Sequence, residues 1–190
     1  MSLKIGVLTS TNRDSRVGIK VANWFLEQAK TADSNLEFEL VDIAGLSFFN
    51  EANLPSMQNY ETETLKNWSA TINGYDGFVI VLAEYNHTPP PPITNALDSL
   101  FNEWSRKAVG FVGYGSYGAE SSIMGLRPLI SYLNMMPLRE SLRITKAHEA
   151  LDKAGRPKEG YLLGDMAKFI GELEWWTKAL SVAKSEQTAA

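Results

Sequence analysis

The sequence contains no cysteine, and this absence excludes several kinds of chemistry. Disulfides, thiolate nucleophiles and cysteine-ligated metal sites cannot form. Only two histidines are present, His87 and His148, and they lie far apart in the sequence, so a histidine-rich metal site is not expected either. We therefore predict a protein that holds no metal.

The sequence also lacks an excess of positive charge and any long apolar run. Its 18 basic and 22 acidic residues give a net charge of −4, and the pI is about 5.3, so nothing in the charge balance favours nucleic acid or an anionic membrane. No segment approaches the length of a membrane span, and the opening MSLKIGVLTS leads directly into a strand-like stretch. We expect a soluble, cytoplasmic protein that binds neither nucleic acid nor membranes.

What the sequence does contain is a regular alternation of short apolar segments with amphipathic ones. The predicted strands are 4–10, 36–43, 77–83, 108–113 and one within 136–145. The predicted helices are 16–30, 61–73, one that starts near Pro92 and runs to 104, 122–133 and 161–183. Strands that alternate with helices favour right-handed crossovers and a parallel sheet.

Five such strands predict a flavodoxin-like α/β fold, a three-layer sandwich with helices on both faces of a five-stranded parallel sheet in the order 2-1-3-4-5. We expect one domain over residues 1–185, because the length suits one well-buried domain and is short for two, followed by a disordered tail at 186–190. In this topology ligands bind at the carboxyl ends of the strands. The loops after strands one, three and four should therefore meet at one crevice.

The loop after the first strand, TSTNRDSRVG at 9–18, is rich in hydroxyl groups and carries Arg13 just before a predicted helix. A helix amino terminus attracts anions through its unpaired N–H groups and its dipole, and Arg and hydroxyl donors add to this. The loop predicts a phosphate site, although capping of the helix by Ser15 or Asp14 explains the same residues equally well. The Walker pattern is absent, which disfavours a nucleoside triphosphate.

The loop after the fourth strand, GYGSYG at 113–118, formally matches the dinucleotide fingerprint G-x-G-x-x-G. That fingerprint belongs after the first strand of a βαβ unit, so we do not predict a dinucleotide site here. We interpret the glycines as letting the backbone approach a flat ligand, flanked by Tyr114 and Tyr117, with a simple glycine-rich turn as the alternative. Because Tyr114 replaces a glycine of the nucleophile elbow, a hydrolase that uses Ser116 is kept only as a rival.

The loop after the third strand, AEYNHTPPPP at 83–92, places an aromatic residue and polar groups at the end of the most apolar strand. Proline is tolerated in the first turn of a helix and pushes the preceding residue out of the α region. We therefore expect residues 88–91 to be extended, with the helix starting at about Pro92. A stiff turn beside Tyr85 favours a preorganised aromatic pocket over a proline-rich docking motif.

Together, these three loops resemble the NADPH-dependent FMN reductase family, a flavodoxin-like group that includes quinone, azo-dye and chromate reductases. The resemblance spans nearly the whole chain and is carried by STNRDSRVGIKVANW, EYNHTPPPPITNALD and GYGSYGAESSIMGLRPLISYL. The sequence departs from the family pattern at Thr9 and Pro91, where the family has Gly, at Ala83, where it has Pro, and at Thr94, where Lys is common. These departures leave the donors of the first loop in place and alter the shape of the substrate side.

The resemblance implies bound FMN, NADPH or NADH as co-substrate, and ping-pong hydride transfer to a small acceptor such as a flavin, a quinone, an azo compound or a metal oxyanion. No side chain is implied as a catalytic acid or base. A homodimer or homotetramer is implied as well. The implied cofactor-binding residues are Ser10, Thr11, Arg13, Ser15, Arg16, Val17, Glu84, Tyr85, Asn86, His87, Gly113, Tyr114, Gly115, Ser116, Tyr117 and Gly118.

Two further functions remain as alternatives. The first is a non-enzymatic electron carrier like flavodoxin, and Arg13 and the modest charge of −4 argue against it, because flavodoxins are usually more acidic and lack an arginine in the phosphate loop. The second is a degenerate binding module without flavin. The departures at Ala83, Pro91 and Thr94 keep this second alternative open.

Overall fold

The computed structural model describes residues 2–32 and 34–188, and its strands form one sheet in the order β2-β1-β3-β4-β5-β6. The strands are β1 (Leu3–Thr9), β2 (Leu36–Val41), β3 (Gly77–Leu82), β4 (Ala108–Tyr114), β5 (Met136–Ile144) and β6 (Leu162–Leu163). Strands β1 to β5 pair in parallel, which confirms the predicted sheet and its order. The two-residue β6 adds an antiparallel edge, so the sheet has six strands and not five.

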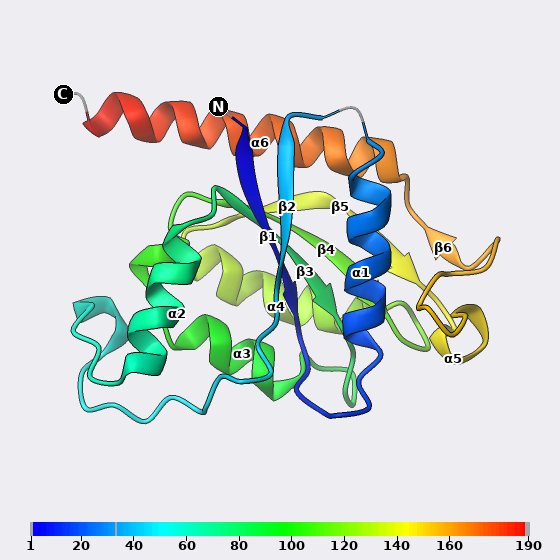
Figure 1. Cartoon of the computed structure of the whole chain (residues 1–190), viewed down its shortest axis with the longest axis horizontal. Coiled ribbons are helices and arrows are strands. Elements are labelled where there is room, and N and C mark those ends of the chain that lie inside the picture. The colour runs from blue at the N-terminus through cyan, green and yellow to red at the C-terminus, as the bar shows by residue number, and fades with distance from the viewer. Residues whose placement is uncertain (1, 33, 189–190) are drawn as a thin grey trace.

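Helices cover both faces of this sheet (Figure 1). They are α1 (Gly18–Ala29), α2 (Glu63–Asn73), α3 (Pro91–Asp98), α4 (Glu120–Tyr132), α5 (Ala147–Ala150) and α6 (Met166–Thr188), with 3-10 turns η1 (Pro55–Met57) and η2 (Asn102–Trp104). Helices α1 and α6 pack on one face, around Phe25 and Phe169. Helices α2, α3 and α4 pack on the other, around Trp68 and Leu97. The predicted three-layer sandwich is confirmed.

Apolar content decides where each strand lies in the sheet. Strand β3, GFVIVL, is apolar and buried at every position, because it lies between β1 and β4 and is covered on both faces. Strand β2 is buried only at Leu36 and Val41 and has three exposed positions between them, as expected for a strand at the edge of the sheet. Both placements follow the sequence prediction.

Helix α3 ends earlier than predicted. It begins at Pro91, one residue before the expected start, and ends at Asp98 rather than at 104. Its last carbonyls are taken by side chains, since the Ser99 hydroxyl donates to the Asn95 carbonyl at 2.5 Å and the Trp104 indole donates to the Leu97 carbonyl at 3.0 Å. These bonds give the last carbonyls of α3 hydrogen-bond donors. They also hold the side chain of Trp104, the last residue of η2, in the core.

Helix α6 begins later and runs further than predicted. Residues 162–163 form β6, and Gly164, with a φ of 99°, separates β6 from the helix. At the other end the helix continues to Thr188, so residues 186–188 of the expected disordered tail are helical, and 189–190 lie outside the described residues. Within the described chain, no helix is both long and apolar enough to cross a membrane.

Candidate functional site

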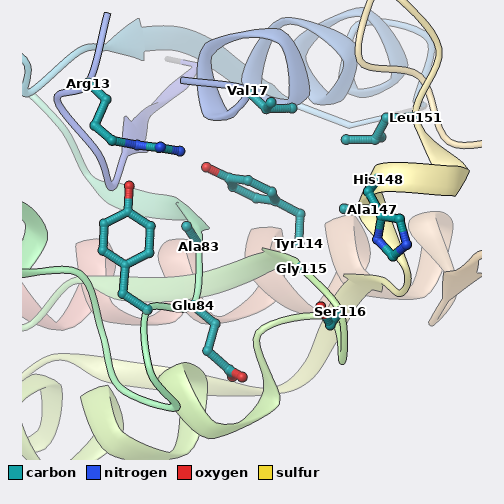
Figure 2. A pocket seen from close by; sticks show the side chains of 11 residues that line it. Arg13, Val17, Ala83, Glu84, Tyr114, Gly115, Ser116, Ala147, His148 and Leu151 are labelled. Atoms are coloured by element: carbon teal, nitrogen blue, oxygen red, sulfur yellow. The ribbon is translucent and has the colours of Figure 1, made fainter. Parts of the chain in front are cut away.

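A cavity of about 290 Å³ lies at the carboxyl-end edge of the sheet (Figure 2). It is next to the point between β1 and β3 where the strand order reverses, which is where doubly wound sheets bind ligands. Four connections contribute to it: those after β1, β3, β4 and β5. The lining residues are Arg13, Val17, Ala83, Glu84, Tyr85, Tyr114, Gly115, Ser116, Ala147, His148 and Leu151.

The amino terminus of α1 forms the polar end of the cavity. Its N-cap is Val17, which makes no side-chain capping hydrogen bond, so neither Ser15 nor Asp14 is the N-cap residue of this helix. Arg13 lines the cavity and lies 5.6 Å from the centre of the Tyr85 ring. An uncapped helix terminus beside a guanidinium is a suitable place for an anion.

Three hydroxyl groups lie around this region, and those of Tyr85 and Tyr114 belong to residues that line the cavity, whereas Thr11 does not line it. The buried Tyr85 hydroxyl has no hydrogen-bond partner within the described part of the chain, and the buried Thr11 hydroxyl lies beside that of Tyr114. Leaving a buried hydroxyl unpaired costs about 1–3 kcal/mol, which a bound polar ligand relieves. Burial raises the pKa of Tyr114, so its hydroxyl, which points toward Arg13 in Figure 2, stays protonated and can donate.

Other residues of the first loop serve the fold instead. The Ser10 hydroxyl accepts a hydrogen bond from the Ala83 amide at 2.9 Å, which fastens the end of β1 to the end of β3. A proline at position 83 could not donate this bond. Arg16 forms an ion pair with Asp42, which follows β2, and Ser15 is exposed. Ser10, Ser15 and Arg16 do not line the cavity.

The β3–α3 connection begins with a tight turn at 85–88, which was not predicted from the sequence, and of the run 88–91 that was expected to be extended, Pro90 is extended and Pro91 already belongs to α3. Tyr85 and Thr88 exchange backbone hydrogen bonds of 3.1 and 3.0 Å. Asn86 and His87 at the tip have φ values of 52° and 60°, which is the signature of a type I′ turn. Both tip residues lie outside the cavity lining, and the His87 ring stacks on Tyr117 with centroids 6.0 Å apart.

Glu84 lines the cavity, yet its carboxylate is directed away from it (Figure 2). One oxygen accepts from the amides of Ser121 and Ser122, at 3.0 and 3.2 Å, in the first turn of α4. The other lies 3.2 Å from His87 Nδ1. Glu84 therefore caps α4 and joins the β3–α3 turn to the β4–α4 loop.

The glycines of GYGSYG have different roles. A Cβ on Gly113 would lie 2.2 Å from the Gly118 carbonyl oxygen, and one on Gly118, whose φ is 68°, would lie 2.8 Å from Arg143 Cβ. These two glycines allow the loop to fold against the chain itself. Only Gly115 of the three lines the cavity, so the interpretation of the glycines as room for a flat ligand applies to Gly115 alone.

Sequence reasoning missed one wall of the cavity. Ala147, His148 and Leu151 come from α5 and the residue after it, downstream of β5. The signal was present, because the carboxyl end of a fifth parallel strand reaches the same edge of the sheet as the other four. His148 had been considered only as a metal ligand, and among the described residues no acidic or histidine cluster is arranged to hold a metal.

The sequence prediction thus divides into two sets. The predicted cofactor-binding residues that line the cavity are Arg13, Val17, Glu84, Tyr85, Tyr114, Gly115 and Ser116. Those that do not line it are Ser10, Thr11, Ser15, Arg16, Asn86, His87, Gly113, Tyr117 and Gly118.

Comparison with known proteins places this site in a family. Residues 3–149 match the model of the NADPH-dependent FMN reductases. The chain belongs to this family. The NAD(P)H-dependent FMN reductase C4B3.06c of Schizosaccharomyces pombe is 35% identical over 136 residues, which are 70% of this chain and 68% of that protein.

Two further relatives extend the comparison. A 2-hydroxy-1,4-benzoquinone reductase from a Burkholderia species is 27% identical over 160 residues, 79% of this chain and 82% of that protein. The structure of FerB, a flavoenzyme NAD(P)H:(acceptor) oxidoreductase from Paracoccus denitrificans, aligns with a TM-score of 0.66 at 21% identity, covering 94% of each chain, and supports the fold. Membership of the family confirms the predicted oxidoreductase class and the predicted use of FMN and NAD(P)H. The serine hydrolase, the electron carrier and the module without flavin are set aside.

Proposed function

We propose that this FMN reductase passes reducing equivalents from NAD(P)H to a small acceptor of the quinone class. One observation supports the proposal above all. A single cavity combines an uncapped helix terminus and a guanidinium with aromatic rings and a glycine backbone. Bound FMN supplies the hydride chemistry, and the chain supplies binding, orientation and electrostatics.

The polar end suits a phosphate monoester. Arg13 presents a permanent positive charge, and the first turn of α1 presents N–H groups that no side chain of the described residues caps. The buried Thr11 hydroxyl lies in the same loop, two residues after the end of β1. We assign Thr11, Arg13 and Val17 as the segment that holds the phosphate. Ser10 and Arg16 support it by fixing the loop and not by direct contact.

The other end suits a flat conjugated ring. Tyr85 and Tyr114 supply aromatic surface, and Gly115 and Ser116 allow close approach of the backbone. The carboxylate of Glu84 is held against the first turn of α4, so its negative charge does not face a ring that must accept electrons. Asn86, His87, Gly113, Tyr117 and Gly118 shape the two loops around this end.

One relative supports a quinone as the acceptor, because a protein that covers most of this chain is named as a benzoquinone reductase. The apolar and aromatic character of Val17, Tyr114 and Leu151 accords with a neutral ring more than with a metal oxyanion. Steady-state NADPH oxidation with 1,4-benzoquinone, an azo dye and chromate should therefore give the highest kcat/KM for the quinone. A higher value for chromate would overturn the assignment of the acceptor.

The flavin assignment is tested by absorption spectroscopy. We expect the purified protein, after addition of FMN and desalting, to retain a flavin spectrum that bleaches when NADPH is added without oxygen. Arg13→Ala should weaken FMN binding by about tenfold or more, the loss expected for one charge-assisted contact to phosphate. Lys66→Ala, an exposed change on α2, serves as the control. A protein that never retains or responds to FMN would falsify the proposed function.

A further inference from the structure

The β5–α6 connection, residues 145–165, is the part of the cavity wall that the family comparison explains least. The family match ends at residue 149, so most of this connection lies beyond it. Of the three residues of this connection that line the cavity, Ala147 and His148 lie within the match and Leu151 lies beyond it. In Figure 2, Leu151 lies on the same side of the view as Val17, with Ala147 and His148 between it and Ser116.

One end of the connection is bonded to the loop that carries Gly115 and Ser116. The Lys146 amide donates to the Ser116 carbonyl at 3.0 Å, and the Ala147 amide donates to the Gly115 carbonyl at 3.1 Å. Tyr117 and Thr145 form a further backbone bridge. The start of α5 and the β4–α4 loop therefore hold each other in place.

The middle of the connection is fastened to α1. Gly155, with a φ of 84°, packs so closely that a Cβ there would lie 2.5–2.9 Å from the Cβ and backbone atoms of Lys20. Arg156 forms an ion pair of 3.1 Å with Glu27, also on α1. The Asp152 carboxylate accepts the amides of Ala154 and Arg156 at 2.8 and 2.9 Å, which closes the segment into a compact loop.

Leu151 lies between these two attachments. It is half-buried and packs against the core cluster of the α1 and α6 face. Its position is fixed by a backbone bridge to Pro157 and by the Lys158 amide, which donates to the Ala150 carbonyl at 2.9 Å. The side chain thus presents an apolar surface to the cavity from a segment that is anchored on both sides.

We propose that the β5–α6 connection is a fourth cofactor-binding segment, a fixed strap that sets the width of the cavity between α1 and the Gly115–Ser116 loop and places Leu151 against the flavin. The inference rests on the proposed function, because it takes the cavity to be the FMN site. Leu151 offers only apolar contact, so it should recognise the carbon framework that FMN and riboflavin share. Arg13, at the other end, should recognise the phosphate that only FMN carries.

This difference gives the test. Flavin fluorescence quenching measures the Kd of FMN and of riboflavin for the apoprotein and its variants. Leu151→Ala should weaken both ligands by a similar factor of about tenfold, since three carbon atoms lose apolar contact. Arg13→Ala should weaken FMN much more than riboflavin. The control Leu163→Ala removes a side chain of equal size from β6 in the same connection, away from the cavity, and should leave both Kd values unchanged.

A pair of glycines tests the strap without removing any lining atom. Gly155 and Gly160 both have a φ of 84°, but a Cβ on Gly160 would meet nothing within 4 Å. The backbone strain of an alanine is therefore the same at both positions, and only Gly155→Ala displaces the strap from α1. We expect Gly155→Ala to weaken binding of both flavins severalfold and Gly160→Ala to leave it unchanged.

The outcomes separate the two proposals. A wild-type protein that binds neither flavin overturns the proposed function, and this inference with it. A wild type that binds both flavins, with Kd values unaffected by Leu151→Ala and Gly155→Ala, overturns the strap alone. Loss of FMN binding without loss of riboflavin binding in Leu151→Ala would also overturn it, because Leu151 would then act through the phosphate loop.

Discussion

At the scale of single residues, Lys107 shows how burial alters a side chain that the sequence presents as ordinary. Its ammonium group lies just before β4, where it donates to the Ile72 carbonyl at 2.7 Å and lies 5.5 Å from the centre of the Phe78 ring. Burial lowers its pKa from the usual 10.5 to about 8. The native state therefore releases this proton at a lower pH than the unfolded chain does.

The sign of the resulting pH dependence follows from linkage. Between the folded pKa of about 8 and the unfolded value of 10.5, the unfolded chain binds one more proton, so stability should rise with pH in this window. Urea unfolding from pH 8 to pH 10 should show wild type gaining about 2–3 kcal/mol relative to Lys107→Met. Lys66→Met, at an exposed position, supplies the matched comparison and should show no such trend. Parallel curves for wild type and Lys107→Met would contradict the depressed pKa.

The role of a site residue could be predicted from the sequence only where its hydrogen-bond or ion-pair partner lies nearby in the chain. Arg13 and Arg16 are three positions apart in one loop, and no pattern in the loop distinguishes their roles. Asp42, which follows a different strand, pairs with Arg16 and leaves Arg13 to the cavity. The Ser10 hydroxyl likewise accepts a hydrogen bond from the Ala83 amide. Such tertiary partners decide which donors remain for a ligand, and loop composition does not record them.

At the scale of elements, Glu103 of η2 holds together a segment with little regular structure. Its carboxylate is buried and accepts from the hydroxyls of Ser69 and Tyr60, at 2.6 and 2.7 Å, and from the Gln58 amide at 3.4 Å. Burial opposes its ionisation, yet the bonds from Ser69 and Tyr60 outweigh burial and keep the pKa of Glu103 below its usual value. One side chain thus links η2, α2 and the end of the β2–α2 connection.

Replacing Glu103 should loosen that connection specifically. Glu103→Ala leaves the half-buried hydroxyls of Ser69 and Tyr60 without an acceptor, so we expect a loss of about 1–2 kcal/mol of stability and earlier proteolytic cleavage within residues 53–60. Because the folded pKa is lowered, the contribution of Glu103 is present at neutral pH and is lost as the pH falls through that pKa. Glu63→Ala, on the exposed surface of α2, should cost less than about 0.5 kcal/mol. Equal losses of stability in Glu103→Ala and Glu63→Ala would show that Glu103 does not hold the connection in place.

The elements themselves were predictable in kind and less so in extent. The short apolar run GFVIVL favours a central strand, and the alternation of strands with helices predicts the flavodoxin-like order, so the sheet and its order could be predicted from the sequence. The end of α3 did not, because side-chain bonds from Ser99 and Trp104 end the helix inside a pattern that remains helical. The two-residue β6 is held by pairing with β5 and has no apolar run of its own.

At the scale of the whole molecule, the winding of the chain brings together groups that are distant in sequence. Parallel strands place their carboxyl ends at one edge, so three of the four connections around the cavity could be located before any coordinates were known. The fourth, after β5, was missed because its residues form no motif. Its contribution arises from anchoring to α1 and to the Gly115–Ser116 loop, which only the assembled fold shows.

The assembled surface also bears on oligomeric state, which we predict to be a homodimer or homotetramer. The outer face of α4 exposes Met124 and Tyr132, which are 63% and 76% exposed, and Tyr117 just before the helix is 65% exposed. Apolar side chains gathered along one helix are typical of a contact surface, and most soluble homo-oligomers form by pairing the same patch on two copies. Such a contact would bring a second copy to the β4–α4 side of the cavity.

Charged substitutions on this face should therefore dissociate the protein. In sedimentation velocity at micromolar concentration, we expect wild type to sediment as a dimer or tetramer and the double variant Met124→Glu, Tyr132→Glu as a smaller species. Trp175→Glu provides the control, because Trp175 is 63% exposed on α6, which packs on the opposite face of the sheet from α4, and its replacement should leave the assembly intact. A monomeric wild type would contradict the prediction of an oligomer. Dissociation by Trp175→Glu alone would show that the subunits meet at α6 and not at α4.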